Sequence, residues 1–283
     1  MKKIIAVIFM FGSIANAYFD GGLNYTSGSN GYSGQDAYIL VGFDNMWIKP
    51  EYSAYKADSV DTYRKYTGRV GFEKSAYTFS FFAGLTPEVN KYENKFGGAD
   101  ITFSLTPSSG NKKRMAGPNT GYGSKSGSGV TQIDLGAGVN YISHTNQDKD
   151  LAQIDTSFFA GAKILMAQIS ANYSFSSYDK TMTLANVGGL AMNEKVAGIN
   201  SNLTGYPKSN VNVKVDLIGY PMVTPFISYT KTKFKLASTD DLNTYTFGAY
   251  IDLNMIGATV SYETYKLGND RKNFLSVSAG IRF

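Results

Sequence analysis

The residue best suited to acid–base chemistry in this sequence is His144, the only histidine of the chain, in the stretch YISHTNQD. A hydrolytic site would need a nucleophile within hydrogen-bond reach of the imidazole and a third group to orient it. Ser143 directly precedes His144, so in an extended strand the two side chains point to opposite faces. The acidic pair Asp240-Asp241 is typical of a solvated turn. These residues do not predict a catalytic site, and His144 is expected at a strand end in a surface loop.

The composition also argues against a metal or cofactor site. The chain has no cysteine and one histidine, and the spacing of its acidic residues does not match a calcium loop. No glycine-rich phosphate loop stands between a strand and a helix. The formal net charge of +5 is too small to indicate nucleic-acid binding. We therefore expect no cofactor, no metal, no nucleic-acid partner and no enzymatic activity.

The first 17 residues have the pattern of a secretory signal peptide. Lys2 and Lys3 precede an apolar run, and Ala15 and Ala17 supply the small residues that a signal peptidase requires. The apolar run is too short to span a bilayer as a helix, which takes about 20 residues. We predict cleavage after Ala17, so that residues 18–283 form one mature domain.

The elements that would carry any function are strands. Segments of about ten residues alternate apolar and polar side chains throughout residues 18–283, and turn-forming residues separate them. The pattern predicts about fourteen strands, with twelve as the alternative because residues 97–106 are the weakest segment. The predicted strands are 18–26, 35–44, 46–56, 62–73, 77–86, 97–106, 130–142, 151–162, 166–177, 209–219, 222–234, 242–253, 255–266 and 273–283.

Alternation alone does not say which face is buried, because a soluble sandwich shows the same pattern. The polar face here is rich in Gly, Ser, Thr, Asn and Tyr with scattered charges of both signs, whereas a solvated face usually carries more Lys and Glu. The strand lengths match the 9 to 11 or so residues that cross a bilayer at a tilt. We therefore predict an all-β, transmembrane, antiparallel up-and-down barrel, with its apolar face toward lipid.

The connections are expected to alternate in length. Short turns are predicted at residues 44–45, 74–76, 164–165, 220–221 and 254, and longer loops at 27–34, 57–61, 143–150, 178–208, 235–241 and 267–272. Residues 107–129 break this rule, because strict counting places this long basic loop on the short-turn side. Either the count is wrong by two strands, or this segment folds across a barrel opening.

These features resemble Gram-negative outer-membrane β-barrel proteins of the monomeric, porin-like class. The resemblance rests on the signal ending Ala15-Asn16-Ala17, the alternating strands and the closing stretch Gly280-Ile281-Arg282-Phe283. It implies a bacterial outer-membrane location, contact with outer-membrane lipid and lipopolysaccharide, and a monomer or small homo-oligomer.

The resemblance also implies an assembly signal in the last strand. Phe283, with Ile281, Ala279 and Val277 at every second position before it, would be recognised by the barrel assembly machinery. Outer-membrane acyl hydrolases place a serine two residues after a rim histidine, where this chain has Asn146, so a hydrolase is not predicted.

The predicted lumen carries the function. With the apolar face toward lipid, the lumen-lining charged residues are Lys49, Glu51, Arg69, Asp100, Asp134, Asp155, Lys214, Asp216, Asp252, Glu263 and Arg282. Fourteen strands enclose more space than the side-chain-filled interior of eight, but inward aromatic residues are expected to constrict it. These residues are Tyr250, Tyr265, Phe82, Phe159, Phe226 and Trp47.

We therefore predict a narrow passive channel for small hydrophilic solutes. Three alternatives stay open. The first is a non-conducting structural or surface-interaction barrel whose lumen charges pair with each other, the second is a rim enzyme using His144, and the third is a carrier for apolar compounds.

Overall fold

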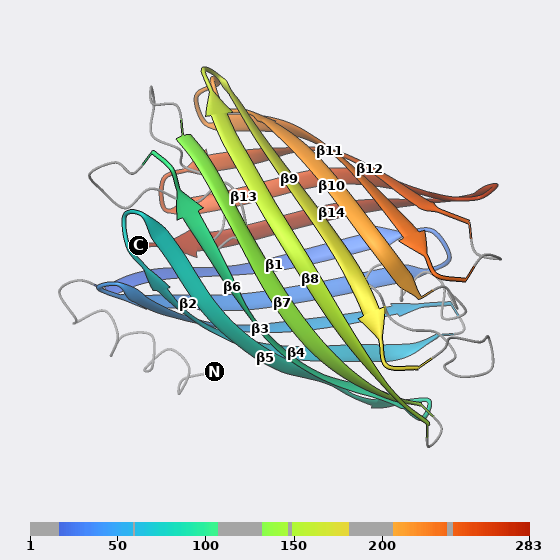
Figure 1. Ribbon diagram of the computed structural model, residues 1–283. Coiled ribbons are helices and arrows are strands. Elements are labelled where there is room, and N and C mark those ends of the chain that lie inside the picture. Colours follow the sequence, from blue (N-terminus) through green and yellow to red (C-terminus); the bar gives the residue numbers. More distant parts are fainter. Residues whose placement is uncertain (1–16, 59, 107–131, 147–148, 181–205, 237–239) are drawn as a thin grey trace, which may run out of the picture.

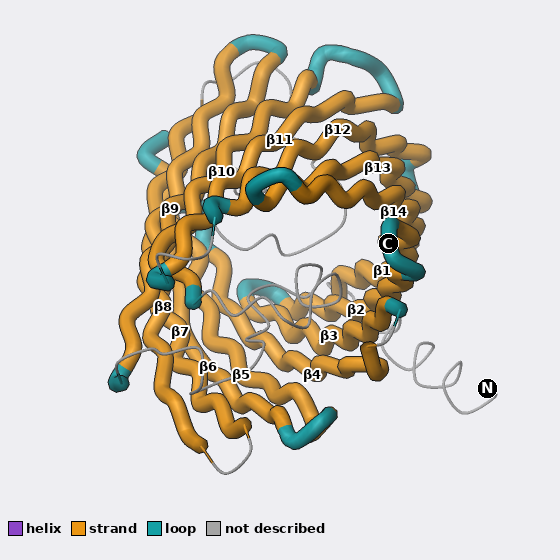
Figure 2. The backbone as a smooth tube through the Cα atoms, turned by 90° about the vertical axis from the view of Figure 1, so that its right-hand side faces the viewer, coloured by secondary structure: helices purple, strands orange, loops and turns teal. Residues whose placement is uncertain are grey.

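The computed structural model describes residues 17–58, 60–106, 132–146, 149–180, 206–236 and 240–283. Fourteen antiparallel strands in these residues form one closed barrel, shown from the side in Figure 1 and end-on in Figure 2. Each strand pairs with its neighbours in the sequence, and β1 also pairs with β14. The strands are β1 (Ala17–Gly28), β2 (Tyr32–Phe43), β3 (Met46–Ala57), β4 (Val60–Glu73), β5 (Tyr77–Val89), β6 (Tyr92–Ser104), β7 (Gln132–Asn146), β8 (Lys149–Ile164), β9 (Ala167–Tyr178), β10 (Pro207–Leu217), β11 (Val223–Phe234), β12 (Leu242–Leu253), β13 (Ile256–Leu267) and β14 (Asp270–Arg282).

The sheet closes where β14 meets β1. The pairing runs from Asp20 opposite Arg282 to Gly28 opposite Phe274. Closure satisfies the backbone N–H and C=O groups that would be costly to expose to lipid. We call the end of the barrel where β1 begins and β14 ends the terminal end, and the opposite end the loop end.

Side-chain exposure decides the orientation of the two faces. Apolar side chains point out of the barrel: Leu23 is 68% exposed and Phe247 is 49% exposed. Polar side chains on the other face are covered, and Asp20 is 0% exposed and Ser80 is 1% exposed. A closed antiparallel barrel with an apolar outer surface is the architecture of bacterial outer-membrane proteins. The predicted fold, with its fourteen strands, is confirmed, and we assign the chain to that membrane.

The strands extend further at the loop end than the alternation predicts, so most of the predicted long loops are wrong. The connection expected at residues 27–34 is a tight turn between Gly28 and Tyr32, with Asn30 and Gly31 at φ 59° and 62°. Such positive φ values suit glycine and asparagine and match the twist of a hairpin. Two residues separate β3 from β4, β7 from β8 and β13 from β14. The predicted turns at the terminal end are short, as expected.

The long connection between β6 and β7 belongs to the terminal end. Residues 107–129 lie outside the described residues, but the flanking strands show where the connection begins and ends. At the terminal end, the backbone N–H of Ser104 donates a hydrogen bond to the carbonyl of Ala76, and that of Leu105 donates one to the carbonyl of Ile133. The strand count was therefore correct, and the predicted error of two strands is excluded.

β1 begins at Ala17, while residues 1–16, including Ala15, lie outside the described residues. Cleavage after Ala17 stays a prediction. Among the residues that the structure describes, no helix is both long and apolar enough to span a membrane.

Candidate functional site

Several inward aromatic rings lie over glycines of the neighbouring strand. Phe82 is paired with Gly98, and a Cβ built on Gly98 would lie 2.5 Å from the Phe82 ring. Phe226 has the same relation to Gly248, also at 2.5 Å. A ring that fills the space above a glycine, which has no side chain, lies along the barrel wall instead of crossing the lumen. Our expectation that such rings constrict the lumen is therefore wrong for Phe82 and Phe226.

Trp47 follows the same rule with Gly71. The two residues are directly paired between β3 and β4, and a Cβ on Gly71 would lie 2.2 Å from the indole. Trp47 is 5% exposed. The expected constriction is wrong here too, because the indole is packed against the barrel wall.

Arg69 covers the exposed face of one of these rings. Its guanidinium carbon lies 4.3 Å from the Phe82 ring centre. The guanidinium also forms an ion pair with Asp100 and donates a 2.7 Å hydrogen bond to Ser80, whose hydroxyl bonds Asp100 at 2.8 Å. Two predicted lumen residues are thus brought together, and the charge of Arg69 is neutralised locally.

Lys214 repeats the arrangement on the opposite wall. Its ammonium lies 4.8 Å from the Phe226 ring centre and 4.7 Å from that of Tyr250. The same ammonium donates a 2.7 Å hydrogen bond to the Tyr250 hydroxyl and lies 2.5 Å from Asp216. The contact with Asp216 is an ion pair only, because Asp216 Oδ1 accepts no hydrogen bond. Tyr250 stacks on Phe226 at 4.7 Å, so it belongs to this cluster on the wall.

Lys49 forms a third cluster of this kind. It pairs with Glu51 at 2.7 Å and lies 4.8 Å from the ring centre of Tyr38. The Tyr38 hydroxyl donates to Asp20 at 2.7 Å, so an inward carboxylate that the sequence reasoning missed joins the cluster. Asp20 stands at an even position of β1, as Gly22 and Asn24 do, so its side chain shares their inward face. This alternation was the signal available in the sequence.

The remaining predicted lumen residues are also held by neighbours. Arg282 pairs with Asp252 at the terminal end. Gln153 and Ser176 donate to Asp155 at 2.7 Å and 2.6 Å. The other two carboxylates accept hydrogen bonds from hydroxyl groups: Asp134 accepts one from Ser104, and Glu263 accepts one from Tyr265 at 3.3 Å.

Charge is concentrated toward one end of the barrel. Eight of the predicted residues lie within the five strand residues nearest the terminal end, namely Lys49, Arg69, Asp100, Asp134, Lys214, Asp216, Asp252 and Arg282. Glu51, Asp155 and Glu263 lie nearer the middle.

The loop end is instead lined by apolar and aromatic side chains, which form one packed cluster that we call the aromatic collar. Its members are Tyr32, Tyr55, Ala57, Tyr63, Tyr92, Leu151, Tyr206, Phe234, Leu242, Tyr265 and Phe274, each 9% exposed or less. Of these, the sequence reasoning identified only Tyr265.

Ring contacts link the collar across strands. Phe274 meets Tyr32 edge-on at 5.2 Å and Tyr265 edge-on at 5.0 Å. On the other side, Tyr63 stacks on Tyr55 at 5.6 Å and lies 6.5 Å from Tyr92. Because members come from strands all around the barrel, the collar encircles the loop end of the lumen.

His144 lies under the collar instead of in a surface loop, so that expectation is wrong. It is 2% exposed, within β7. Nδ1 lies 2.9 Å from the Tyr92 hydroxyl and Nε2 lies 3.0 Å from Gln153 Oε1, so both ring nitrogens have partners. Ser143 points outward, and the Asp240-Asp241 pair precedes β12, five strands away from β7. Among the described residues, the ring nitrogens of His144 therefore bond to Tyr92 and Gln153, and not to Ser143 or to the acidic pair.

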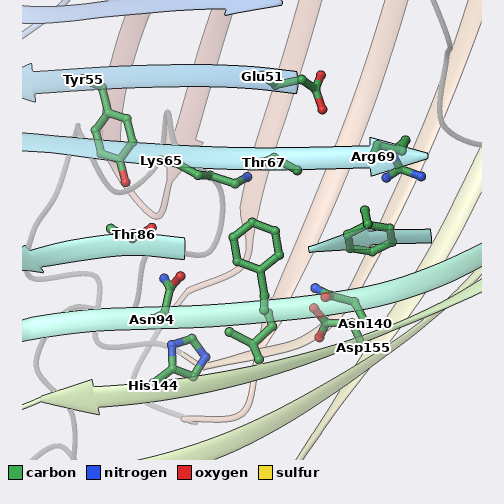
Figure 3. A pocket seen from close by; sticks show the side chains of 13 residues that line it. Glu51, Tyr55, Lys65, Thr67, Arg69, Thr86, Asn94, Asn140, His144 and Asp155 are labelled. Carbon is green, nitrogen blue, oxygen red and sulfur yellow. The ribbon is translucent and has the colours of Figure 1, made fainter. Parts of the chain in front are cut away.

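A cavity of about 390 Å³ adjoins the collar, and residues of the six strands from β3 to β8 line it. Figure 3 shows Lys65, Thr67 and Arg69 along β4 on one side and Asn94 and His144 on the other. Phe82 and Phe96 also line it. A cavity lined by rings, by neutral polar groups and by charged groups of both signs accommodates water and small polar molecules. Within the described residues, no group of three or more His, Asp or Glu side chains is placed to hold a metal ion.

No protein-family model and no curated protein matches this sequence. In structure, the chain is similar to the CymD monoaromatic hydrocarbon channel, with a TM-score of 0.52 over 97% of this chain and 90% of that chain at 9% identity. It is also similar to OprD from Pseudomonas aeruginosa, with a TM-score of 0.46 over 95% of this chain and 94% of that chain at 7% identity.

CdiB from Acinetobacter baumannii matches 95% of this chain with a TM-score of 0.45 at 10% identity, and this chain spans 60% of the length of CdiB. At 9% identity, the likeness to CymD shows the fold alone. The fold expected from the resemblance to outer-membrane barrels is confirmed.

Proposed function

We propose that the protein is a narrow passive channel for small hydrophilic solutes across the outer membrane. The observation that carries the proposal is the polar inner face, which continues from the charged terminal end to the cavity below the aromatic collar. Rings that would otherwise cross the lumen lie over glycines, which leaves space along the axis. The fold itself does not fix the function, because similar barrels serve different roles.

The charges of the lumen predict weak ion selectivity. Arg69, Lys49 and Lys214 each lie beside a carboxylate, so the charge of each of these three cations is neutralised locally. The two opposite charges of such an ion pair cancel most of each other's field at distances beyond about a Debye length of 8 to 10 Å. The channel therefore discriminates solutes by size and polarity more than by charge.

The aromatic collar is the restricting element of the proposed channel. An apolar constriction opposes the passage of water and ions even where it is wide enough to admit them, because it disfavours wetting. The collar therefore gives a small conductance and limits the size of a hydrated solute.

A second candidate is a non-conducting barrel that acts through its surface, and the collar also favours it. Phe274 and Tyr206 are each 1% exposed, which is as buried as a core residue. A collar packed this tightly would close the lumen.

Planar-bilayer recording of the purified mature protein separates the two candidates. Discrete conductance steps from inserted protein support the channel. Absence of steps, with insertion verified by protease protection of reconstituted vesicles, supports the closed barrel and refutes the channel.

A further inference from the structure

The outer face of β11 to β14 carries charge at one end only. Starting from the terminal end, its outward side chains are apolar over most of each strand, and cations follow at the loop end. The cations are Lys231, Lys233, Lys266 and Arg271, which we call the basic band. Within the described residues of these four strands, no outward position holds Asp or Glu.

The basic band runs across neighbouring strands. Lys231 is paired with Asn243, Asn243 with Lys266, and Lys266 with Arg271. Like charges directly opposite each other on one face of a sheet are destabilising. Lys266 and Arg271 stand in this relation, so the fold gains nothing from their charges alone.

Only one cation of the band has a carboxylate partner in the part of the chain that the structure describes. Lys231 lies 3.0 Å from Asp241. Arg271 donates its Nε–H to the hydroxyl of Thr264 at 2.9 Å, a neutral group. Lys233, Lys266 and Arg271 have no ion pair with any described residue, and all three are exposed.

The neighbouring tyrosines fix the depth of the band in the membrane. Tyr229, Tyr245 and Tyr262 lie on the outer face next to the band on its terminal side, and the Tyr229 and Tyr245 rings are 5.1 Å apart. Tyrosine belts mark the border between hydrocarbon and headgroups. From Tyr245 to Leu253, the outward residues that follow in β12 are apolar. These eight residue steps of about 3.4 Å, in a strand tilted by about 40°, span about 21 Å along the membrane normal. This height is near the apolar band of about 25 Å on such barrels.

We propose that the loop end faces the cell exterior and that the basic band binds the phosphate groups of the lipid headgroups in that leaflet, which are those of lipopolysaccharide. The cations lie at headgroup depth and form a row, and three of the four, Lys233, Lys266 and Arg271, have no counter-charge among the described residues. An arginine fork and flexible lysines are suited to phosphate oxygens. This proposal concerns the outer surface and holds whether or not the lumen conducts.

The test measures binding of lipid A to the full mature chain in detergent micelles. The variant is Lys266→Gln/Arg271→Gln, and the matched control is Lys56→Gln/Arg64→Gln, which removes two outward cations from the loop-end halves of β3 and β4. We expect affinity for bisphosphorylated lipid A to fall about tenfold in the variant and to stay within about twofold in the control, since each lost phosphate contact weakens binding severalfold. Heat-dependent gel mobility verifies folding, and the single variant Lys233→Gln, expected to lose about threefold, replaces the double variant if that one does not fold.

Two further probes identify the ligand. Dephosphorylated lipid A should bind the wild type as weakly as it binds the variant, and inorganic phosphate should not compete at millimolar concentration. Equal losses in the variant and the control would reduce the effect to net charge and overturn the proposal. Undiminished binding of dephosphorylated lipid A, or binding of inorganic phosphate as tight as that of lipid A, would also overturn it.

Discussion

The rings of Phe19 and Phe283 stack 4.9 Å apart with an interplanar angle of 20°, on the outer surface where the last strand closes against the first. The same two residues exchange backbone hydrogen bonds of 2.8 Å and 3.0 Å. The outermost pair at the terminal end is therefore joined through both backbone and side chains. An aromatic ring at this position stabilises the seam of the barrel at the membrane border.

This contact predicts a measurable coupling between Phe19 and Phe283. A double-mutant cycle with Phe19→Ala and Phe283→Ala should give a coupling free energy of about 0.5–1.5 kcal/mol, which is typical of an aromatic pair. Urea unfolding in lipid vesicles measures it. Strictly additive effects of the two substitutions would show that the rings do not cooperate in closing the barrel.

Trp47 provides a direct probe of the rings that lie over glycines, because it is the only tryptophan of the chain. Gly71→Ala places a methyl group in the space of the indole, so the ring must move or the wall must distort. We expect a shift in tryptophan emission and a loss of about 1–3 kcal/mol of unfolding free energy, as for other overpacked sites.

Gly68→Ala on the same strand is the matched control for Gly71→Ala. No atom lies within 4 Å of a Cβ built on Gly68, so emission and stability should be unchanged within about 0.5 kcal/mol. Similar responses of the two variants would mean that the loss at Gly71 comes from strand flexibility and not from the indole.

The pairing of Arg69 with Asp100 predicts how ion selectivity responds to mutation. Asp100→Asn leaves the positive charge of Arg69 without its counter-charge, so the channel should favour anions more. A unit charge about 8 Å from a passing ion in water contributes about 0.5 kcal/mol, or roughly a factor of two in the permeability ratio.

Reversal potentials in a potassium chloride gradient measure this change. Arg64→Gln, which removes an outward charge of the same strand, is the control and should leave the reversal potential unchanged. A shift of the Asp100→Asn variant toward cations would contradict the assignment of Arg69 and Asp100 to the ion path.

Local patterns in the sequence predict the architecture well for a physical reason. Each strand must present apolar side chains to lipid and polar ones to the lumen, so strands such as β10 and β12 show their period in the residues themselves. Strand ends were predicted less well. Beyond the lipid, the outer face becomes polar, as at Lys266 and Arg271, and the alternation disappears although backbone pairing continues.

The arrangement of the lumen depends on pairing register, which the local pattern does not contain. Phe82 and Gly98 are far apart in sequence, and their contact follows only from the alignment of β5 with β6. The aromatic collar was missed for a related reason. Tyr32, Tyr92 and Phe274 each stand near the loop end of a separate strand, and only the closed barrel brings those ends to one level. An aromatic residue at the first or last inward position of many strands was the available signal.

The proposed function depends on the aromatic collar, which would limit a polar lumen by an apolar constriction at the loop end. Single-channel recording of wild type, Tyr63→Ala and Tyr66→Ala tests it most directly, because both tyrosines lie on β4 but Tyr63 belongs to the collar and Tyr66 points outward at 46% exposure. We predict discrete steps for the wild type, larger steps for Tyr63→Ala and wild-type steps for Tyr66→Ala. Equal conductance in all three proteins, or no conductance in any of them after verified insertion, would contradict the account.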